Sequence, residues 1–154
     1  MRKLLLAAVL LTACSKAETP AVDTTAKMTP PPPAAPAKLT AADVAGTWHG
    51  ESKADGKDSV VAKWTSVRMT ETSGKFVYDG SKDTVTFTTT FDADSMIATS
   101  AAYVNPRTPK GPKVMFRSIG WLKDGKLWGK SVTLLASKPD SVMGRGTWEA
   151  TKAP

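Results

Sequence analysis

The chain has 154 residues, of which 41% are hydrophobic and 23% charged, a composition that suits at most one globular domain with appended segments. Its single cysteine and single histidine exclude a structural zinc site. The formal net charge of +7 lies in residues 105–154, which carry 10 basic and 3 acidic side chains, whereas residues 1–104 carry 11 of each. A basic half can attract anionic partners, or it can keep exposed β-strands soluble.

Residues 1–13 have the pattern of a secretory signal peptide. Two basic residues precede an apolar run over residues 4–13, which at ten residues is too short to span a bilayer. The run ends in Leu11-Thr12-Ala13-Cys14, which resembles the lipobox of bacterial lipoprotein signal peptides. The resemblance implies attachment of a diacylglyceryl group to the Cys14 sulfur, cleavage before Cys14, and acylation of the new amino group. The alternative is an ordinary signal peptide cut near Ala13.

The lipobox resemblance also implies a location. Several acyl chains on one residue anchor a protein durably, whereas a single chain binds a membrane only marginally. Residue 15 is Ser rather than Asp, which in Gram-negative lipoproteins implies sorting to the outer membrane. We therefore expect a palmitate-bearing lipoprotein anchored in the cell envelope by its acyl chains, in the outer membrane if the source is Gram-negative. We expect no nucleic-acid partner there.

Residues 14–41 are predicted to link the lipidated Cys14 to a folded domain over residues 42–154. Six of the eleven prolines lie between positions 20 and 36, and the run Pro30–Pro33 favours a stiff polyproline II conformation. All eleven glycines and all five tryptophans lie from Gly46 onward. This change of composition places the domain boundary near residue 42.

From residue 45 the sequence alternates apolar and polar residues between turn signals, which predicts an all-β domain. A turn over residues 41–45, with Thr40 as N-cap, is the one candidate for helix. We expect an antiparallel, eight-stranded up-and-down barrel, with a β-sandwich as the alternative. The expected strands cover residues 45–52, 59–70, 74–79, 83–91, 95–104, 113–122, 126–136 and 142–151.

The clearest hairpin runs from Trp121 to Trp128, because Asp124-Gly125 at its tip suits a two-residue type I′ turn. Such a turn sets Trp121 opposite Trp128 and Gly120 opposite Gly129. Paired glycines permit sharp curvature of the sheet or the close approach of another group. Both faces of the hairpin carry apolar residues, so the pattern does not assign the inward face.

The first and last expected strands share the sequence Gly-Thr-Trp, at residues 46–48 and 146–148. In both strands the tryptophan shares its face with glycines, while the other face is polar. Trp48 and Trp148 are therefore predicted to point inward and to meet where the last strand pairs with the first. The Gly-x-Trp near the start of the domain resembles the opening strand of lipocalin and avidin-like barrels. This resemblance favours the barrel and implies no particular ligand.

No constellation in the sequence predicts catalysis or a bound metal. His49 is the only histidine and falls on the polar face of its strand, so we expect a non-enzymatic protein. Acidic turn residues around the strand at 83–91 offer a loose calcium site, but turns favour aspartate in any case. These residues are Asp79, Asp83, Asp92 and Asp94. We expect no metal and no cofactor.

Two groups of residues are candidates for binding. The tryptophans either line a cavity for a small apolar ligand or fill the core; they are Trp48, Trp64, Trp121, Trp128 and Trp148. Arg107, Lys110 and Lys113 belong to an irregular loop that is either an anion-contacting lip at the barrel mouth or a solvated connection. The expected function is a membrane-anchored, non-catalytic β-domain that binds a small apolar ligand or an envelope component. The alternative is a pocketless interaction module that docks on an envelope protein or a polyanion.

Overall fold

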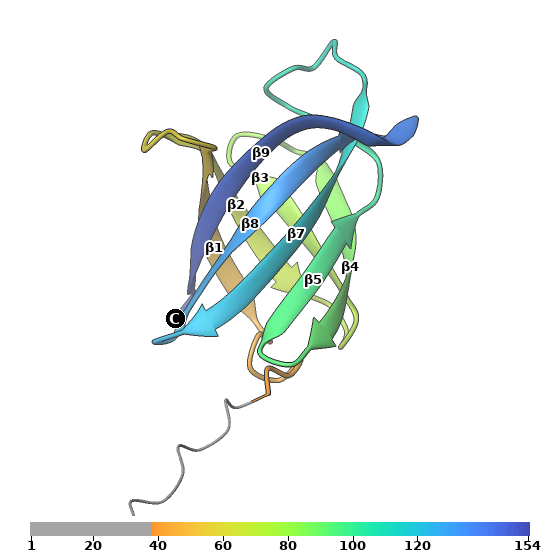
Figure 1. The fold of residues 1–154 in the computed structure, drawn as a ribbon. Helices are drawn as coiled ribbons and strands as arrows, with labels where there is room; N and C mark the ends of the chain where they lie inside the picture. The colour runs from red at the N-terminus through yellow and green to blue at the C-terminus, as the bar shows by residue number, and fades with distance from the viewer. Residues whose placement is uncertain (1–37) are drawn as a thin grey trace, which may run out of the picture. The chain divides into compact units, whose positions relative to one another are not determined.

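The computed structural model describes residues 38–154, so the expected signal peptide, Cys14 and most of the expected linker lie outside the described residues. Residues 38–154 form antiparallel strands and no helix (Figure 1). The strands are β1 (Thr47–Ala54), β2 (Val60–Arg68), β3 (Ser73–Tyr78), β4 (Thr84–Asp92), β5 (Ser95–Ser100), β6 (Tyr103–Val104), β7 (Lys113–Lys123), β8 (Lys126–Leu135) and β9 (Lys138–Lys152).

Eight of these strands form a closed up-and-down barrel. Strands β1 to β5 pair in chain order, β7 to β9 do the same, β9 pairs with β1, and β5 pairs with β7. The two-residue strand β6 is an addition that pairs with the start of β7. Closure leaves no open sheet edge in the ring. The predicted barrel is therefore confirmed, and the sandwich alternative is wrong.

Most strands match their predicted extents to within two residues, and two differ more. The strand expected at 95–104 divides into β5 and β6, because the Ser100 hydroxyl accepts a hydrogen bond from the Phe116 backbone N–H (2.9 Å) in place of a backbone carbonyl. Strand β9 begins at Lys138, inside a segment expected to be a turn. Its Pro139 is the second residue of the strand, close to the end where a residue without an N–H is tolerated.

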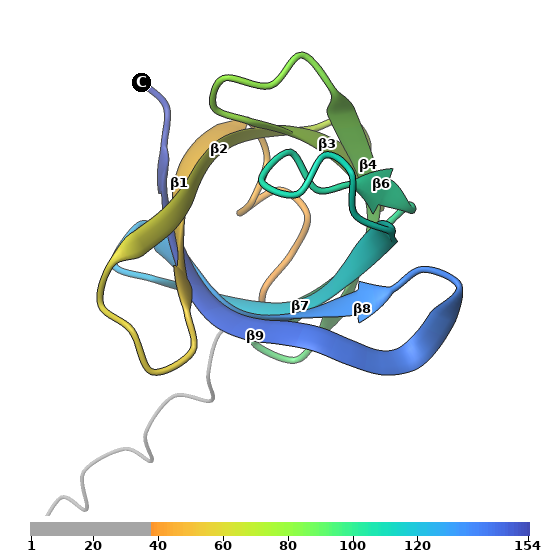
Figure 2. The same cartoon turned by 90° about the horizontal axis from the view of Figure 1, so that it is seen from above.

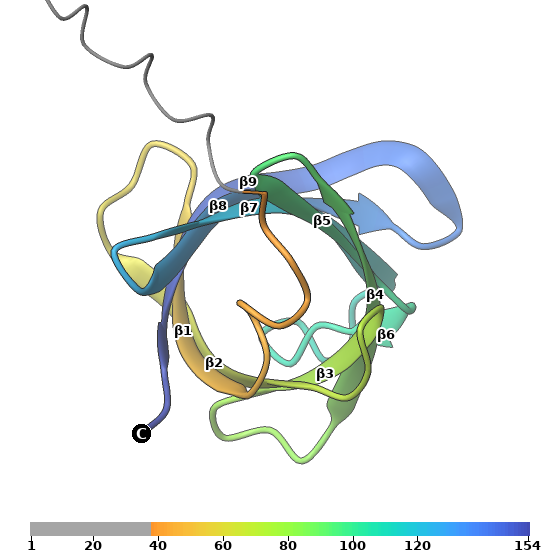
Figure 3. The same ribbon diagram turned by 90° about the horizontal axis from the view of Figure 1, so that it is seen from below.

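Residues 38–46 close the lower end of the barrel (Figure 3, orange segment). Leu39 and Val44 are 6% and 1% exposed, and the Leu39 backbone N–H donates to the Ala93 carbonyl (2.9 Å). A turn, rather than a helix, forms at 41–44, and the Asp43 carboxylate accepts hydrogen bonds from the Thr40 backbone N–H and hydroxyl (2.8 and 2.7 Å). Leu39 therefore belongs to the packed domain, although it precedes the boundary expected from composition.

The main hydrophobic core lies at this lower end, around the inward side chains of the strands. Its buried members come from the closing segment, β1, β5, β8 and β9, and are Leu39, Val44, Trp48, Met96, Leu127 and Ala150. Partly buried residues pack against them, namely Trp64, Phe91, Leu122 and Trp148. Packing of this end leaves the remaining length of the barrel for a cavity.

The β7–β8 hairpin has the predicted register. Trp121 pairs with Trp128 and Gly120 with Gly129, and the positive φ angles of Asp124 (52°) and Gly125 (74°) are those of a type I′ turn. The structure also assigns the inward face, which the pattern left open. The two glycines point inward and the two tryptophans point outward, because the glycine positions are covered by the indole of Trp148.

Candidate functional site

The barrel encloses a cavity of about 560 Å³. It extends from Val44 of the lower closing segment to Thr108 and Gly111 of the loop between β6 and β7. Figure 2, which looks down on the upper end, shows this loop curling over part of the barrel opening. The cavity is therefore closed below and reached from above, beside the loop.

Three of the five tryptophans proposed from the sequence line the cavity: Trp48, Trp64 and Trp148. Trp121 and Trp128 do not, because they stack on each other on the outer face with ring centroids 4.7 Å apart. The five residues therefore do not form one site. The last strand pairs with the first as expected, but Trp148 lies opposite Ser52, four positions along from Trp48, and packs edge-on against Trp64 (6.0 Å).

The inward tryptophans present apolar surface to the cavity, because each indole N–H already has a protein acceptor. Trp48 donates to the Val44 carbonyl (3.1 Å), Trp64 to the Ser52 hydroxyl (2.9 Å) and Trp148 to the Ser118 hydroxyl (2.8 Å). Buried indoles usually find such partners. A ligand therefore meets the rings through apolar contact.

Glycines on the neighbouring strands make room for these rings. A β-carbon at Gly50 would overlap the indole of Trp64, and one at Gly129 would lie 2.5 Å from Trp148 Cζ2. The rings therefore lie flat against the barrel wall over glycine positions. This arrangement keeps two large side chains from filling the barrel interior.

The upper part of the cavity is lined by a second aromatic group. Phe76 packs edge-on against Tyr78 (5.0 Å) and Tyr103 (6.0 Å), and the two phenol oxygens lie 3.1 Å apart. Burial is the main cause that raises the pKa of both tyrosines above the ordinary value. Both phenols are therefore neutral at physiological pH and add polar groups to the aromatic upper part of the wall.

The basic loop contributes to the cavity through only one of its three candidate residues. Arg107 lines the upper opening, and its backbone N–H donates to the Asn105 side-chain oxygen (3.0 Å). Lys110 and Lys113 are exposed and do not line the cavity. Of the three candidates, only Arg107 therefore lies at the opening of the cavity.

Arg68, at the lower end of β2, lines the cavity and was not among the candidate residues predicted from the sequence. Its guanidinium carbon lies 5.8 Å from the Phe87 ring centroid and 5.7 Å from that of Phe91, and Nη2 donates to Met96 Sδ (3.8 Å). Nη1 is buried and has no hydrogen-bond partner within residues 38–154. Burial lowers the pKa of Arg68, but arginine stays protonated in proteins. A pattern signal existed, because Arg68 is four residues from Trp64 and therefore shares its strand face.

The remaining candidates lie on the outside. His49 is exposed, and its Nδ1 lies 3.0 Å from the Thr65 hydroxyl. Asp79 and Asp83 follow β3 at the upper end, whereas Asp92 and Asp94 flank the lower end of β4. Within residues 38–154 no three His, Cys, Asp or Glu residues gather as metal ligands. The same residues include no helix long and apolar enough to cross a membrane.

No family model, curated protein or solved structure matches this chain. The barrel and its cavity are therefore the basis for proposing a function.

Proposed function

We propose that this chain is a lipid-anchored protein of the bacterial cell envelope whose barrel binds a small apolar ligand without catalysing a reaction. The observation that carries the binding part is the cavity of about 560 Å³ with largely aromatic and aliphatic walls. Ligand-binding cavities typically enclose about 300–1,000 Å³ and combine apolar walls with a few polar groups. The lipobox-like sequence ending at Cys14 supports the anchor, with the outer membrane as the proposed location in a Gram-negative source.

Uptake of the neutral fluorophore N-phenyl-1-naphthylamine tests the binding part. The full-length chain carrying Cys14→Ser is the appropriate protein, because none of its own acyl chains can then enter the assay. We expect a saturable rise in fluorescence that 1-dodecanol reverses, because both molecules are apolar and small enough for the cavity. A rise that does not saturate, or no rise, would contradict the proposal.

Two tryptophan variants locate the binding. Trp64 lines the cavity, whereas Trp128 lies outside it with 43% of its surface exposed. We expect Trp64→Leu to weaken binding of the fluorophore about fivefold, because an aromatic contact contributes about 1 kcal/mol. The matched Trp128→Leu variant should bind as the unmodified chain does. Equal effects of the two substitutions would place the fluorophore elsewhere.

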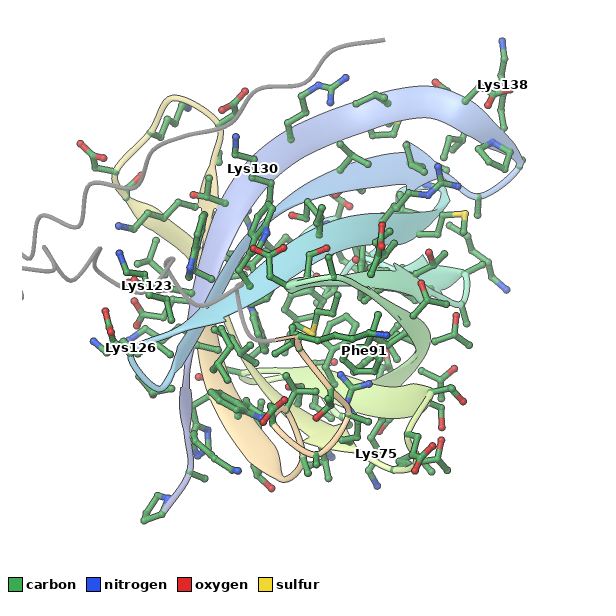
Figure 4. All side chains as sticks on the ribbon, turned by 60° about the horizontal axis from the view of Figure 1, so that its bottom comes forward. Lys75, Phe91, Lys123, Lys126, Lys130 and Lys138 are labelled. Atoms are coloured by element: carbon green, nitrogen blue, oxygen red, sulfur yellow. The ribbon has the colours of Figure 1, made fainter. Side chains whose placement is uncertain are left out.

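A second candidate function, docking on an anionic surface, is supported by the outer face of the β7–β8 hairpin. The stacked pair of Trp121 and Trp128 lies there between two cross-strand pairs, Ile119 with Lys130 and Lys123 with Lys126. Figure 4 shows Lys123 and Lys126 together at one corner of the barrel, with Lys130 farther along. Exposed aromatic rings flanked by lysines suit a polyanionic envelope component.

Sedimentation with phosphatidylglycerol vesicles tests this second function. We expect the double variant Lys123→Glu/Lys126→Glu to lose most vesicle binding at low salt, because it reverses two charges beside the exposed tryptophans. Lys57→Glu is a suitable control, since Lys57 is exposed in the loop between β1 and β2. Equal vesicle binding by both variants would remove the hairpin face from consideration.

A further inference from the structure

The guanidinium of Arg68 has an incomplete set of partners inside the barrel. A guanidinium carries five N–H donors, but its acceptor within residues 38–154 is the sulfur of Met96, a weak one. The Phe87 and Phe91 rings offset part of the charge by cation–π attraction. They accept no hydrogen bond in the plane of the guanidinium, and Nη1 stays without a partner.

No acidic side chain lines the cavity that Arg68 faces. Within residues 38–154 the one ion pair joins Lys63 to Glu51 (2.9 Å), and it lies on exposed side chains. Arg68 is half-buried, and removing part of a charge from water without a counter-charge is costly for a folded protein. The position of Arg68 is therefore poorly explained by folding alone and well explained by an anion that enters the cavity.

The upper opening has the charge that would draw an anion inward. Lys53, Arg107 and Arg145 line the cavity there. Cations around the mouth of a cavity with low-dielectric walls raise the local concentration of anions and speed their association. Positive charge thus stands at the entrance and at the lower end, with aromatic walls between them.

A second unpartnered polar atom lies on the inner face of β4. Thr89 is 2% exposed, and its hydroxyl oxygen has no hydrogen-bond partner within the described residues. Along the inner face of β4 it falls between Phe87 and Phe91, the two rings that flank the guanidinium. Buried hydroxyls are usually hydrogen-bonded, but Thr89 does not line the cavity, so a ligand in the cavity would rely on Arg68 for its polar contact.

We propose that the cavity binds a single-chain amphiphile with a carboxylate head, such as a fatty acid, and that Arg68 binds the carboxylate at the lower end. This inference rests on the proposed function of the cavity and adds the class of its ligand. A carboxylate presents two oxygens that match the planar fork of a guanidinium. The acyl chain then lies against Trp64, Trp148 and Phe76 toward the opening.

The charge inside the barrel favours a carboxylate over a phosphate. One arginine faces the lower end of the cavity, so one negative charge is neutralised there. A monoester phosphate carries about 1.5–2 negative charges at neutral pH, which leaves part of its charge uncompensated beside the phenylalanine rings. A fatty acid should therefore bind more tightly than the alkyl phosphate of the same chain length.

Displacement of N-phenyl-1-naphthylamine by matched C12 ligands tests the inference on the full-length Cys14→Ser chain. We expect dodecanoate at pH 8 to displace the fluorophore at about tenfold lower concentration than 1-dodecanol, because charge-assisted hydrogen bonds to the half-buried Arg68 distinguish them. Dodecyl phosphate should be weaker than dodecanoate. Equal displacement by dodecanoate and 1-dodecanol would overturn the carboxylate head, and tighter binding of dodecyl phosphate would assign the site to phosphate.

The variant Arg68→Gln should abolish the preference for dodecanoate while leaving displacement by 1-dodecanol within about twofold. Arg117→Gln is the matched control, because Arg117 is exposed on β7 and its loss removes the same charge. Arg68→Lys keeps the charge without the fork and should retain part of the preference. If Arg68→Gln fails to fold, the role of Arg68 is tested by Arg68→Lys. The carboxylate head is then tested by the ligand series on the Cys14→Ser chain that retains Arg68.

The outcomes separate this inference from the proposed function. If the fluorophore itself does not bind, the cavity is not a ligand site and both proposals fail. If the fluorophore binds and 1-dodecanol displaces it as well as dodecanoate does, the cavity function stands and the anionic head alone is wrong. A dodecanoate preference that survives Arg68→Gln would overturn the role of Arg68.

Discussion

The indole of Trp148 on β9 lies along the barrel wall over Gly129 of β8 and Gly120 of β7, in the space that a larger residue at Gly120 would need. A β-carbon at Gly120 would lie 2.7 Å from both Cη2 and Cζ2 of Trp148 and 3.1 Å from Met96 Cε. Non-bonded carbon atoms are most stable about 3.5–4.0 Å apart. The hairpin glycines and the tryptophan of the last strand are therefore one packing unit.

Substituting Gly120→Ala should lower the free energy of unfolding by about 1–3 kcal/mol, because the added methyl group forces the Trp148 ring out of its place. Urea unfolding monitored by tryptophan fluorescence measures the change. Gly144→Ala is the control, since a β-carbon at Gly144 meets nothing within 4 Å, and it should change stability by no more than about 0.5 kcal/mol. Equal destabilisation by the two alanines would contradict this packing.

Removal of the Leu39 side chain should destabilise the barrel although Leu39 precedes the first strand. The side chain is 6% exposed and packs in the lower core with Val44 and Trp48. We expect Leu39→Ala to cost about 2 kcal/mol, at the low end for a buried leucine, because the closing segment has room to adjust. Lys38→Ala, at an exposed neighbouring position, should be neutral. An unchanged urea midpoint for Leu39→Ala would mean that this segment does not close the barrel.

The two tyrosines of the chain should ionise only above the ordinary tyrosine range. Burial raises the pKa of both Tyr78 and Tyr103 in the folded protein. A raised folded-state pKa means that their contribution to stability is complete below the unfolded pKa of about 10 and is lost as the pH rises through the folded pKa. Alkaline titration at 295 nm should therefore show delayed phenolate absorbance, and stability should fall above about pH 10.

The Tyr103→Phe variant checks that assignment. It removes one phenol from the pair and the 3.1 Å contact between the two oxygens. Half of the delayed absorbance change should then remain, from Tyr78. Normal titration near pH 10 in the unmodified protein would show that the phenols are open to water.

Lipidation should depend on Cys14. In a bacterial host, metabolic labelling with palmitate should mark the chain, and Cys14→Ser should remove the label, because the thiol is the attachment point that the lipobox resemblance implies. The substitution should also move the protein from the membrane fraction to the soluble fraction. Label that persists in the Cys14→Ser variant would exclude this anchor.

Local sequence patterns determined most of the architecture. The period-two alternation and the Asp124-Gly125 turn specified strands, hairpins and the pairing of Trp121 with Trp128, because these depend on residues near one another in the chain. The repeated Gly-Thr-Trp also indicated that the ends of the domain meet, and β1 pairs with β9. The pairing register of those two strands depends on closure of the whole ring, so the sequence did not predict that Trp48 lies opposite Lys152 and Trp148 opposite Ser52. Both indoles nevertheless pack in or against the same hydrophobic core.

The candidate site was predicted only in part. The sequence made all five tryptophans candidates for the cavity. An outward pair on a hairpin and an inward tryptophan both occur in strands that alternate apolar and polar residues, so the pattern does not distinguish them. It did not mark Arg68, because a charged residue on a strand usually faces water. The structure separates these residues by bringing Phe87, Phe91 and Met96 from neighbouring strands around the guanidinium.

By itself, the sequence determined the strands, the tight turns and the lipobox-like segment, each of which is encoded within a short stretch of chain. Only the tertiary structure decided that the barrel keeps a cavity, because that depends on Trp64 and Trp148 lying over glycines of other strands. It also decided that Arg68 faces inward among aromatic rings without an acidic partner. Both outcomes arise from contacts between side chains on different strands, which no single short stretch of the sequence encodes.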